Sequence, residues 1–198
     1  MIAIAFTVLF ACKNRRNSIE LAVQTEDTIG ASTPYLPVIA ILKSDKAFAD
    51  SFATAYLRRI ESAGKKDSAF ITPEVFSQLA SGYFLPELQD SLSFRQQFKE
   101  SSVMDQSTEL LTFIYTPKSP ASGIQQVTVY VQPNDGNGQI NRVYMERTYD
   151  KGDTVVKQKM TWKLKQYFYT ITIKQPANGE ASVTTEKVIW NPQLFQED

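Results

Sequence analysis

The sequence predicts an α+β fold, with two to three N-terminal helices packed on a curved antiparallel β-meander of about five to six strands. Two observations carry this prediction. Apolar residues recur every three to four positions in the first half of the chain and every second position from Glu109 onward. The segments between the alternating stretches are rich in Gly, Pro, Asn and Asp, which accept turn geometry. Helices first and hairpin-linked strands afterwards are typical of a segregated α+β domain.

The first helix is predicted between Ser44 and Gly64, after a short apolar run at residues 38–42. Ser44 is a suitable N-cap, and a glycine just past the last apolar position is common at helix C-termini. Between them, aromatic and aliphatic residues recur at i+4 and would form one buried face. These residues are Phe48, Phe52, Tyr56 and Ile60.

Two further helices are predicted before the strands begin. The second begins at Thr72, whose hydroxyl can cap it, and ends near Pro86. The third is short and begins at Ser93, where Phe94 and Phe98 would share one apolar face.

Six strands are predicted in the second half, at residues 110–116, 125–132, 139–149, 154–164, 167–175 and 181–190. In the fourth predicted strand the apolar positions are even-numbered, with Val156, Met160, Trp162 and Leu164 assigned to the core, and in the fifth they are odd-numbered from Tyr167 to Ile173. This change of phase predicts a tight turn or a bulge near Lys165 and Gln166. The order of elements is similar to that of the cystatin-like and nuclear-transport-factor-like folds, which bend a sheet around helices.

An uncharged apolar stretch occupies residues 2–10. It is shorter than the roughly 20 residues that a membrane-spanning helix needs, but it has the length of a signal-peptide core. It runs into Leu9, Phe10, Ala11 and Cys12, and this LFAC resembles the lipobox of bacterial lipoproteins. The predicted organisation is a signal peptide, a lipidated tether and a single α+β domain, at residues 1–11, 12–33 and 34–198.

The lipobox resemblance implies cleavage before Cys12, acylation of that cysteine, and attachment to a membrane of the bacterial cell envelope. Lys13 is not the aspartate that, in some bacteria, retains lipoproteins at the inner membrane, so the resemblance favours the outer membrane, with the periplasmic or surface side left open. The alternative is a buried N-terminal strand in which Cys12 is incidental. Ile19, Leu21 and Val23 of the tether would suit an edge strand.

Composition argues against several classes of function. The chain has 21 basic and 21 acidic residues, a balance that does not favour a nucleic-acid partner. It has no histidine, and Cys12 is its single cysteine, so the domain lacks the side chains of the common nucleophilic and zinc sites. We therefore predict no catalytic residues, no metal site and no cofactor.

Alternation along the fourth predicted strand places lysines on one face. They are Lys157, Lys159, Lys163 and Lys165. This stripe is either the solvated face of the sheet or a docking surface for an anionic partner, such as lipid phosphates or an acidic protein.

Two other features admit more than one interpretation. Aromatic residues are dense in the second half of the chain, and they fill the core or line an apolar pocket for a small ligand. In the third predicted strand, either Arg147 faces inward with Val143 and Met145, or Glu146 faces inward with Tyr144. An inward charge needs a partner.

The predicted function is an envelope lipoprotein with a non-enzymatic domain that binds another envelope protein or an apolar ligand. Two alternatives are a small bent-sheet enzyme of the lyase or isomerase type, working with carboxylates, Tyr and Lys, and a purely structural component. An enclosed pocket that holds Glu146 or Arg147 beside a tyrosine hydroxyl would favour the enzyme.

Overall fold

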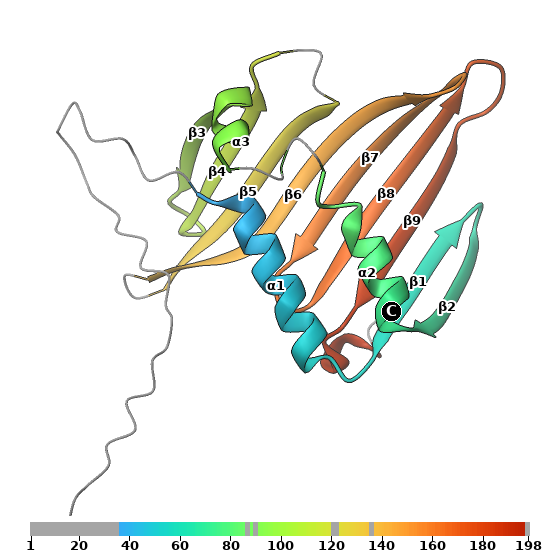
Figure 1. Cartoon of the computed structure of the whole chain (residues 1–198), viewed down its shortest axis with the longest axis horizontal. Coiled ribbons are helices and arrows are strands. Elements are labelled where there is room, and N and C mark those ends of the chain that lie inside the picture. The colour runs from blue at the N-terminus through green and yellow to red at the C-terminus, as the bar shows by residue number, and fades with distance from the viewer. Residues whose placement is uncertain (1–35, 86–87, 89–90, 120–122, 135–136, 197–198) are drawn as a thin grey trace, which may run out of the picture.

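The computed structural model describes residues 36–85, 88, 91–119, 123–134 and 137–196 (Figure 1). In chain order the elements are α1 (Val38–Phe52), β1 (Tyr56–Ser62), β2 (Lys65–Ile71), α2 (Pro73–Ser81), α3 (Ser91–Gln97), β3 (Phe98–Asp105), β4 (Leu110–Pro117), β5 (Ile124–Asn134), β6 (Asn137–Lys151), β7 (Thr154–Lys163), β8 (Tyr167–Pro176), β9 (Ser182–Ile189) and the 3₁₀ helix η2 (Pro192–Leu194). The predicted signal peptide, the lipobox with Cys12 and the tether lie outside the described residues.

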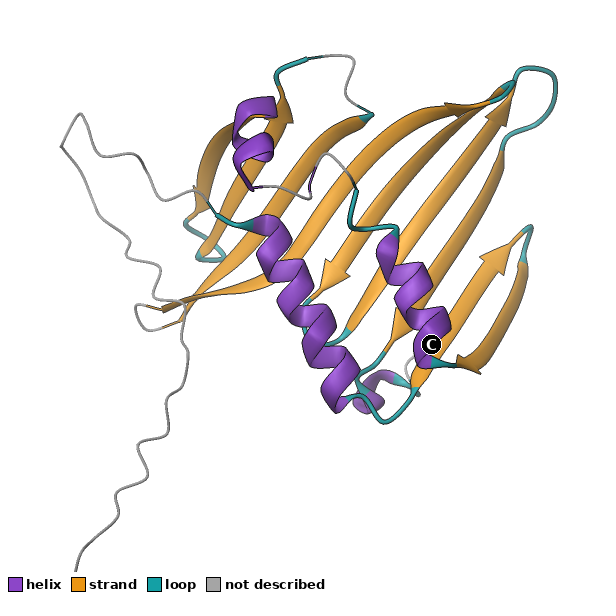
Figure 2. Cartoon of the chain, in the orientation of Figure 1, coloured by secondary structure: helices purple, strands orange, loops and turns teal. Residues whose placement is uncertain are grey.

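The strands of the described residues belong to one nine-stranded antiparallel sheet in the order β2-β1-β9-β8-β7-β6-β5-β4-β3. From β3 to β9, each strand pairs with the next strand along the chain. The β1–β2 hairpin joins this meander at its C-terminal strand, where Leu57 pairs with Ile189. The sheet curves, and the helices lie across one of its faces (Figures 1 and 2). We call this the inner face and the opposite one the outer face.

The predicted fold class is wrong. In the described residues, one nine-stranded sheet makes up most of the domain, and three short helices are added to it, whereas we predicted two to three helices on five to six strands. Strands are present at all six positions predicted in the second half, but three more strands precede them. A hairpin between α1 and α2 also removes the element order on which the similarity to cystatin-like and nuclear-transport-factor-like folds was based.

The first error lies between Ser44 and Gly64. The helix occupies Val38–Phe52 instead, and the chain from Tyr56 onward forms the β1–β2 hairpin. Ala63 and Gly64 supply its turn with φ angles of 50° and 74°, and positive φ at both central residues is what a type I′ turn requires. Gly64 is therefore a hairpin residue and not a helix cap. The i+4 spacing did not distinguish a helix from a strand, because Tyr56 and Ile60 also fit the period of two of a strand.

The second error concerns Phe98, which we placed in the third helix. It is the first residue of β3, an edge strand in which every following residue is exposed. An edge strand that is exposed on both faces shows no alternation of apolar and polar residues, so the periodicity could not reveal it.

The core lies between the inner face and the helices. Trp162 of β7, Phe168 of β8 and Trp190 after β9 pack with aromatic residues of α2 and the segment that follows it. Those residues are Phe76 and Tyr83, and all five are almost fully buried. The predicted burial of Met160 and Trp162 is thus confirmed, and much of the aromatic density is core packing.

Asp45 connects α1 to the sheet. It is a buried charged residue, and its carboxylate accepts hydrogen bonds from Trp162 Nε1 at 2.7 Å and from the backbone N–H of Lys165 at 3.0 Å. Burial raises the pKa of Asp45, and the bond from Trp162 opposes that shift. Lys165 has a φ of 61° in the turn between β7 and β8, which confirms the tight turn predicted near Lys165 and Gln166.

Candidate functional site

The pairing register decides which residues share the outer face. Trp162 pairs with Val143 on one side and Phe168 on the other, and all three are buried against the helices. The alternate positions must then point outward. Tyr167 pairs with Lys163. The odd-numbered residues of β8, Tyr167 and Tyr169 among them, therefore lie on the outer face, and Phe168 between them is in the core.

Three of the four lysines in the predicted stripe lie on this outer face. Lys157, Lys159 and Lys163 alternate along β7 with the buried Met160 and Trp162, as predicted. Lys165 does not belong with them. It lies beyond the end of β7 in the turn, and its Nζ is 5.8 Å from the ring centre of Phe48 on α1. Alternation holds only within a strand, and β7 ends at Lys163, so the predicted stripe wrongly included Lys165.

Tyrosines and further cations surround these lysines. The Arg142 guanidinium lies over the Tyr130 ring at 4.1 Å, and Lys187 Nζ lies over the Tyr167 ring at 4.3 Å. We call the whole surface the tyrosine–cation face. It consists of Tyr130, Arg142, Tyr144, Lys157, Lys159, Lys163, Tyr167, Tyr169 and Lys187, which β5 to β9 place on the outer side of the sheet.

Charge is segregated on this face. The cross-strand pairs Arg142–Lys163 and Thr148–Lys157 mark the two ends of this part of the sheet. Between them, with both pairs included, the outer side of β5 to β9 carries five cations and one carboxylate, Glu146. The whole chain has no net charge. The tyrosine–cation face is therefore a positive surface on a neutral protein, and its summed field attracts anions.

Glu146 sits between two of these residues. The Tyr144 hydroxyl donates a hydrogen bond to its carboxylate, and Lys159 Nζ lies 3.6 Å from it. Burial, and then the neighbouring Glu146 carboxylate, raise the pKa of Tyr144, so the phenol stays protonated at neutral pH. The pair can hold a hydrogen bond, but it does not supply a tyrosinate base.

Burial, together with the charge of Arg142, lowers the pKa of Lys163. Its ammonium donates to the side-chain oxygen of Asn141. Lys159 and Lys157 are more exposed, with 54% of the Lys159 side chain accessible. The face thus combines Lys163, which is partly buried and hydrogen-bonded, with the more exposed Lys157 and Lys159.

The structure resolves the choice between Arg147 and Glu146. Arg147 points inward with Val143 and Met145, and its Nε donates to Gln158 Oε1 at 2.5 Å. Gln158 in turn donates to Thr172 Oγ1 at 3.1 Å. Arg147 is therefore satisfied by neutral partners on the inner face, while Glu146 points outward.

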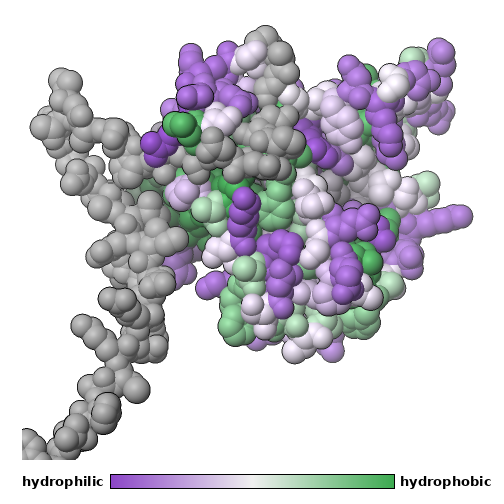
Figure 3. Space-filling view, viewed as in Figure 1, coloured by the Kyte–Doolittle hydropathy of each residue, from purple (hydrophilic) through white to green (hydrophobic). Residues whose placement is uncertain are grey.

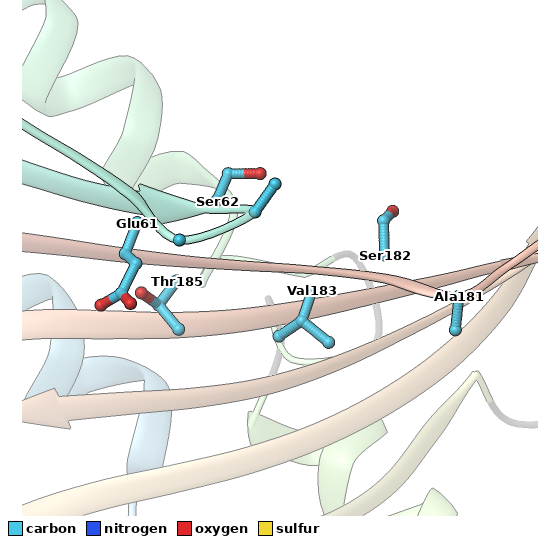
Figure 4. Close-up of a pocket in the computed structure, with 8 residues that line it drawn as sticks. Glu61, Ser62, Ala181, Ser182, Val183 and Thr185 are labelled. Atoms are coloured by element: carbon cyan, nitrogen blue, oxygen red, sulfur yellow. The ribbon is translucent and has the colours of Figure 1, made fainter.

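A separate hollow of about 400 Å³ lies where β1 ends beside the start of β9 (Figure 4). Glu61, Val183 and Thr185 project to one side of the strands there, and Ser62 and Ser182 to the other. Glu61 is the one titratable residue in its lining. The hollow therefore lacks the pair of positioned groups that acid–base chemistry requires.

No group of three or more potential metal ligands occurs among the described residues. β5 and β6 pair up to Asn134 and Asn137, so these two strands form an antiparallel hairpin, as predicted. Figure 3 shows the helix-bearing side, where polar and apolar residues are mixed, and the tyrosine–cation face lies on the opposite side of the sheet.

Sequence reasoning missed the tyrosines and two of the cations of this face. The signal was present in the hairpin between β7 and β8. Its turn is centred on Lys165, so residues equally distant from it pair and point the same way, which places Tyr167 with Lys163.

Comparisons with known proteins do not assign a family. The sequence matches no protein-family model and no curated protein, and no solved structure matches the chain. In the part of the chain that the structure describes, no helix is long and apolar enough to cross a membrane.

Proposed function

We propose that this protein is a lipid-anchored component of the bacterial cell envelope, and that its domain is a non-enzymatic module that docks on an anionic phospholipid surface. The anchor is the acylated Cys12 implied by the lipobox. The docking surface is the tyrosine–cation face. The observation that carries the proposal is the segregation of five cations against one carboxylate on this face of an overall neutral chain.

The chemistry of the face supports a lipid surface over an acidic protein. Tyrosines are enriched at membrane–water interfaces, where the ring contacts the acyl boundary and the hydroxyl stays hydrated. Lysine and arginine near an anionic bilayer each contribute about 1 kcal/mol. A single acyl chain binds membranes only marginally, and a basic surface is one of the second signals that make attachment stable.

The enzyme alternative has less support. The tyrosine hydroxyl beside Glu146 is on the outer face and not in an enclosed pocket. The hollow of Figure 4 has one titratable residue in its lining. Neither place combines enclosure with two positioned groups.

The anchor is tested by metabolic labelling. Labelled fatty acid should attach to the wild-type chain, and the Cys12→Ser variant should take up none. Label on Cys12→Ser would contradict the lipobox assignment.

The docking surface is tested with the full chain carrying Cys12→Ser, so that no acyl chain contributes to binding. It should float with vesicles of phosphatidylcholine that contain about one-third phosphatidylglycerol, and added salt should release it. Equal flotation with pure phosphatidylcholine would contradict the proposal. Binding to an acidic envelope protein with no vesicle binding would replace the lipid by a protein partner.

A further inference from the structure

Among the described residues, β3 forms one edge of the sheet, and no described strand pairs with its backbone groups on that side. Its side chains after Phe98 are exposed. They include two apolar residues, Val103 and Met104, which are 56% and 55% exposed. An exposed edge with apolar side chains is a template for pairing with another strand.

The register with β4 identifies which backbone groups are available. Phe98 pairs with Pro117, which has no N–H, and the adjacent Lys118 donates its N–H to Gln97 at 2.7 Å. Hydrogen-bonded pairs alternate with non-bonded pairs in an antiparallel ladder. The odd-numbered residues of β3 therefore bond to β4. Glu100 and Ser102, like the other even-numbered residues, direct their N–H and C=O groups to the open edge.

The opposite edge of the sheet is less suited to pairing. β2 begins with Lys65 and Lys66, and lysine at an edge discourages association. A symmetric pairing that places Lys65 opposite Asp67 of a second copy also places Lys66 opposite itself. Like charges directly opposite each other are unfavourable.

We propose that β3 pairs antiparallel with β3 of a second copy of this chain, with Ser102 opposite Ser102 on the two-fold axis. In this register Lys99 of each copy faces Asp105 of the other. Glu100 faces Met104, so no like charges meet. The sequence of the strand, FKESSVMD, is thus self-complementary in charge.

Neighbouring registers lack this complementarity. With Val103 on the axis, Lys99 faces Ser107 and Asp105 faces Ser101. With Ser101 on the axis, Lys99 faces Val103. Both shifts lose the two ion pairs, and only the register on Ser102 keeps them.

Asp105 is well placed for its role. It accepts hydrogen bonds from the Ser107 N–H at 2.9 Å and from the Ser107 hydroxyl at 2.7 Å. The Ser107 and Thr108 bonds lower the pKa of Asp105 to about 2. The carboxylate is therefore charged and held at the end of the strand.

The dimer has a consequence for the whole molecule. The two-fold axis between antiparallel strands that exchange hydrogen bonds is perpendicular to the sheet, so the outer faces of both copies point the same way. The two tyrosine–cation faces would lie side by side on one continuous sheet. Two linked surfaces bind the same target more tightly than one.

The test is disulfide trapping in the full chain, with Cys12→Ser removing the natural thiol. In a hydrogen-bonded antiparallel pair the Cα atoms are about 5.5 Å apart, which a disulfide can bridge. Ser102→Cys should therefore form covalent dimers under mild oxidation. Ser101→Cys is the matched control, since its counterpart is diagonal and about 7 to 8 Å away, too far for efficient bridging.

A charge reversal tests the register. Lys99→Glu in the Ser102→Cys chain turns both attractive pairs into repulsive ones and should lower the dimer yield roughly tenfold. Lys66→Glu on β2 makes the same change in charge and should leave the yield unaltered. Similar yields from Ser101→Cys and Ser102→Cys, or no dimer from either in chains with a wild-type melting temperature, would overturn the proposal. The experiment needs no vesicles, so its outcome is independent of the proposed docking function.

Discussion

The Asp45 carboxylate accepts the indole N–H of Trp162 at 2.7 Å, and this buried bond joins the first helix to the seventh strand across 117 residues of chain. The same carboxylate receives the backbone N–H of Lys165 and so holds the β7–β8 turn. That turn fixes which side chains of β8 point outward. Asp45 therefore stabilises the strand phase on which the tyrosine–cation face depends.

Replacing Asp45 with Ala should lower the free energy of unfolding by about 2 to 3 kcal/mol, because the buried indole N–H of Trp162 and the partly buried backbone N–H of Lys165 lose a charged acceptor. The control is Asp50→Ala. Asp50 is an exposed residue of the same helix that pairs with Lys46 at 2.6 Å, and its loss should cost under about 1 kcal/mol. Urea denaturation measures the free energy of unfolding of both variants. Equal losses would mean that the hydrogen bonds of Asp45 do not stabilise the contact between α1 and the sheet.

The raised pKa of Asp45 gives stability a defined pH dependence. A carboxyl whose pKa is higher in the folded state favours folding most below its unfolded value of about 3.9, and this contribution is lost as pH rises through the folded value. The free energy of unfolding of the wild type minus that of Asp45→Asn should therefore increase as the pH falls from about 7 to 4. A difference that is constant or decreases toward acid would contradict the buried, desolvated carboxylate.

A hairpin and a helix at Ala63 predict opposite effects of an asparagine at this position on stability. Ala63 has a φ of 50°, a conformation that Asn accepts more readily than Ala. Ala63→Asn should raise the free energy of unfolding by about 0.5 to 1 kcal/mol, and Ala63→Val should lower it by about 1 kcal/mol. In a helix, Asn would instead be mildly unfavourable. Thermal unfolding of the two variants distinguishes the hairpin from a helix.

Trp162 and Lys157 test the two faces of β7. Trp162 is completely buried, and Trp162→Ala should cost roughly 3 to 5 kcal/mol. Lys157 is exposed on the outer side, and Lys157→Ala should change stability by less than about 0.5 kcal/mol. A comparable loss in Lys157→Ala would place that side chain in the folded core and not on a docking surface.

The second half of the sheet was predictable because its strands alternate and its turns are rich in Gly, Asn and Pro. Met160 and Trp162 show the pattern at its clearest. The hairpin at Ala63 was not predictable in the same way, since Tyr56 and Ile60 fit both a helical and a strand period. β3 gave no signal, because an edge strand exposed on both sides has no buried face to alternate with.

Only part of the candidate site could be predicted from the sequence, because alternation reveals the faces of one strand but not its neighbours. Three lysines of β7 followed directly from alternation within one strand. Arg142, Tyr144 and Lys187 join them only through pairing between strands, and that depends on where each turn begins. The change of apolar phase does predict the turn at Lys165, but it does not set the register of β6 or β9.

The central claim is that the tyrosine–cation face, and not positive charge in general, attaches the domain to an anionic membrane. Its direct test compares two variants of the full Cys12→Ser chain that each lose four positive charges. In the first, glutamine replaces four cations of the face, Arg142, Lys159, Lys163 and Lys187. In the second, glutamine replaces four exposed lysines elsewhere, Lys43, Lys65, Lys118 and Lys174.

The measurement is partitioning into phosphatidylglycerol-containing vesicles, with both melting temperatures recorded. With about 1 kcal/mol for each of the four cations at the surface, the first variant should bind roughly a thousandfold more weakly than the parent chain. The second should bind within about threefold of it, because its lysines lie away from the contact. Equal weakening in the two variants, or unchanged binding in the first, would contradict the claim and leave the outer face as the solvated side of the sheet.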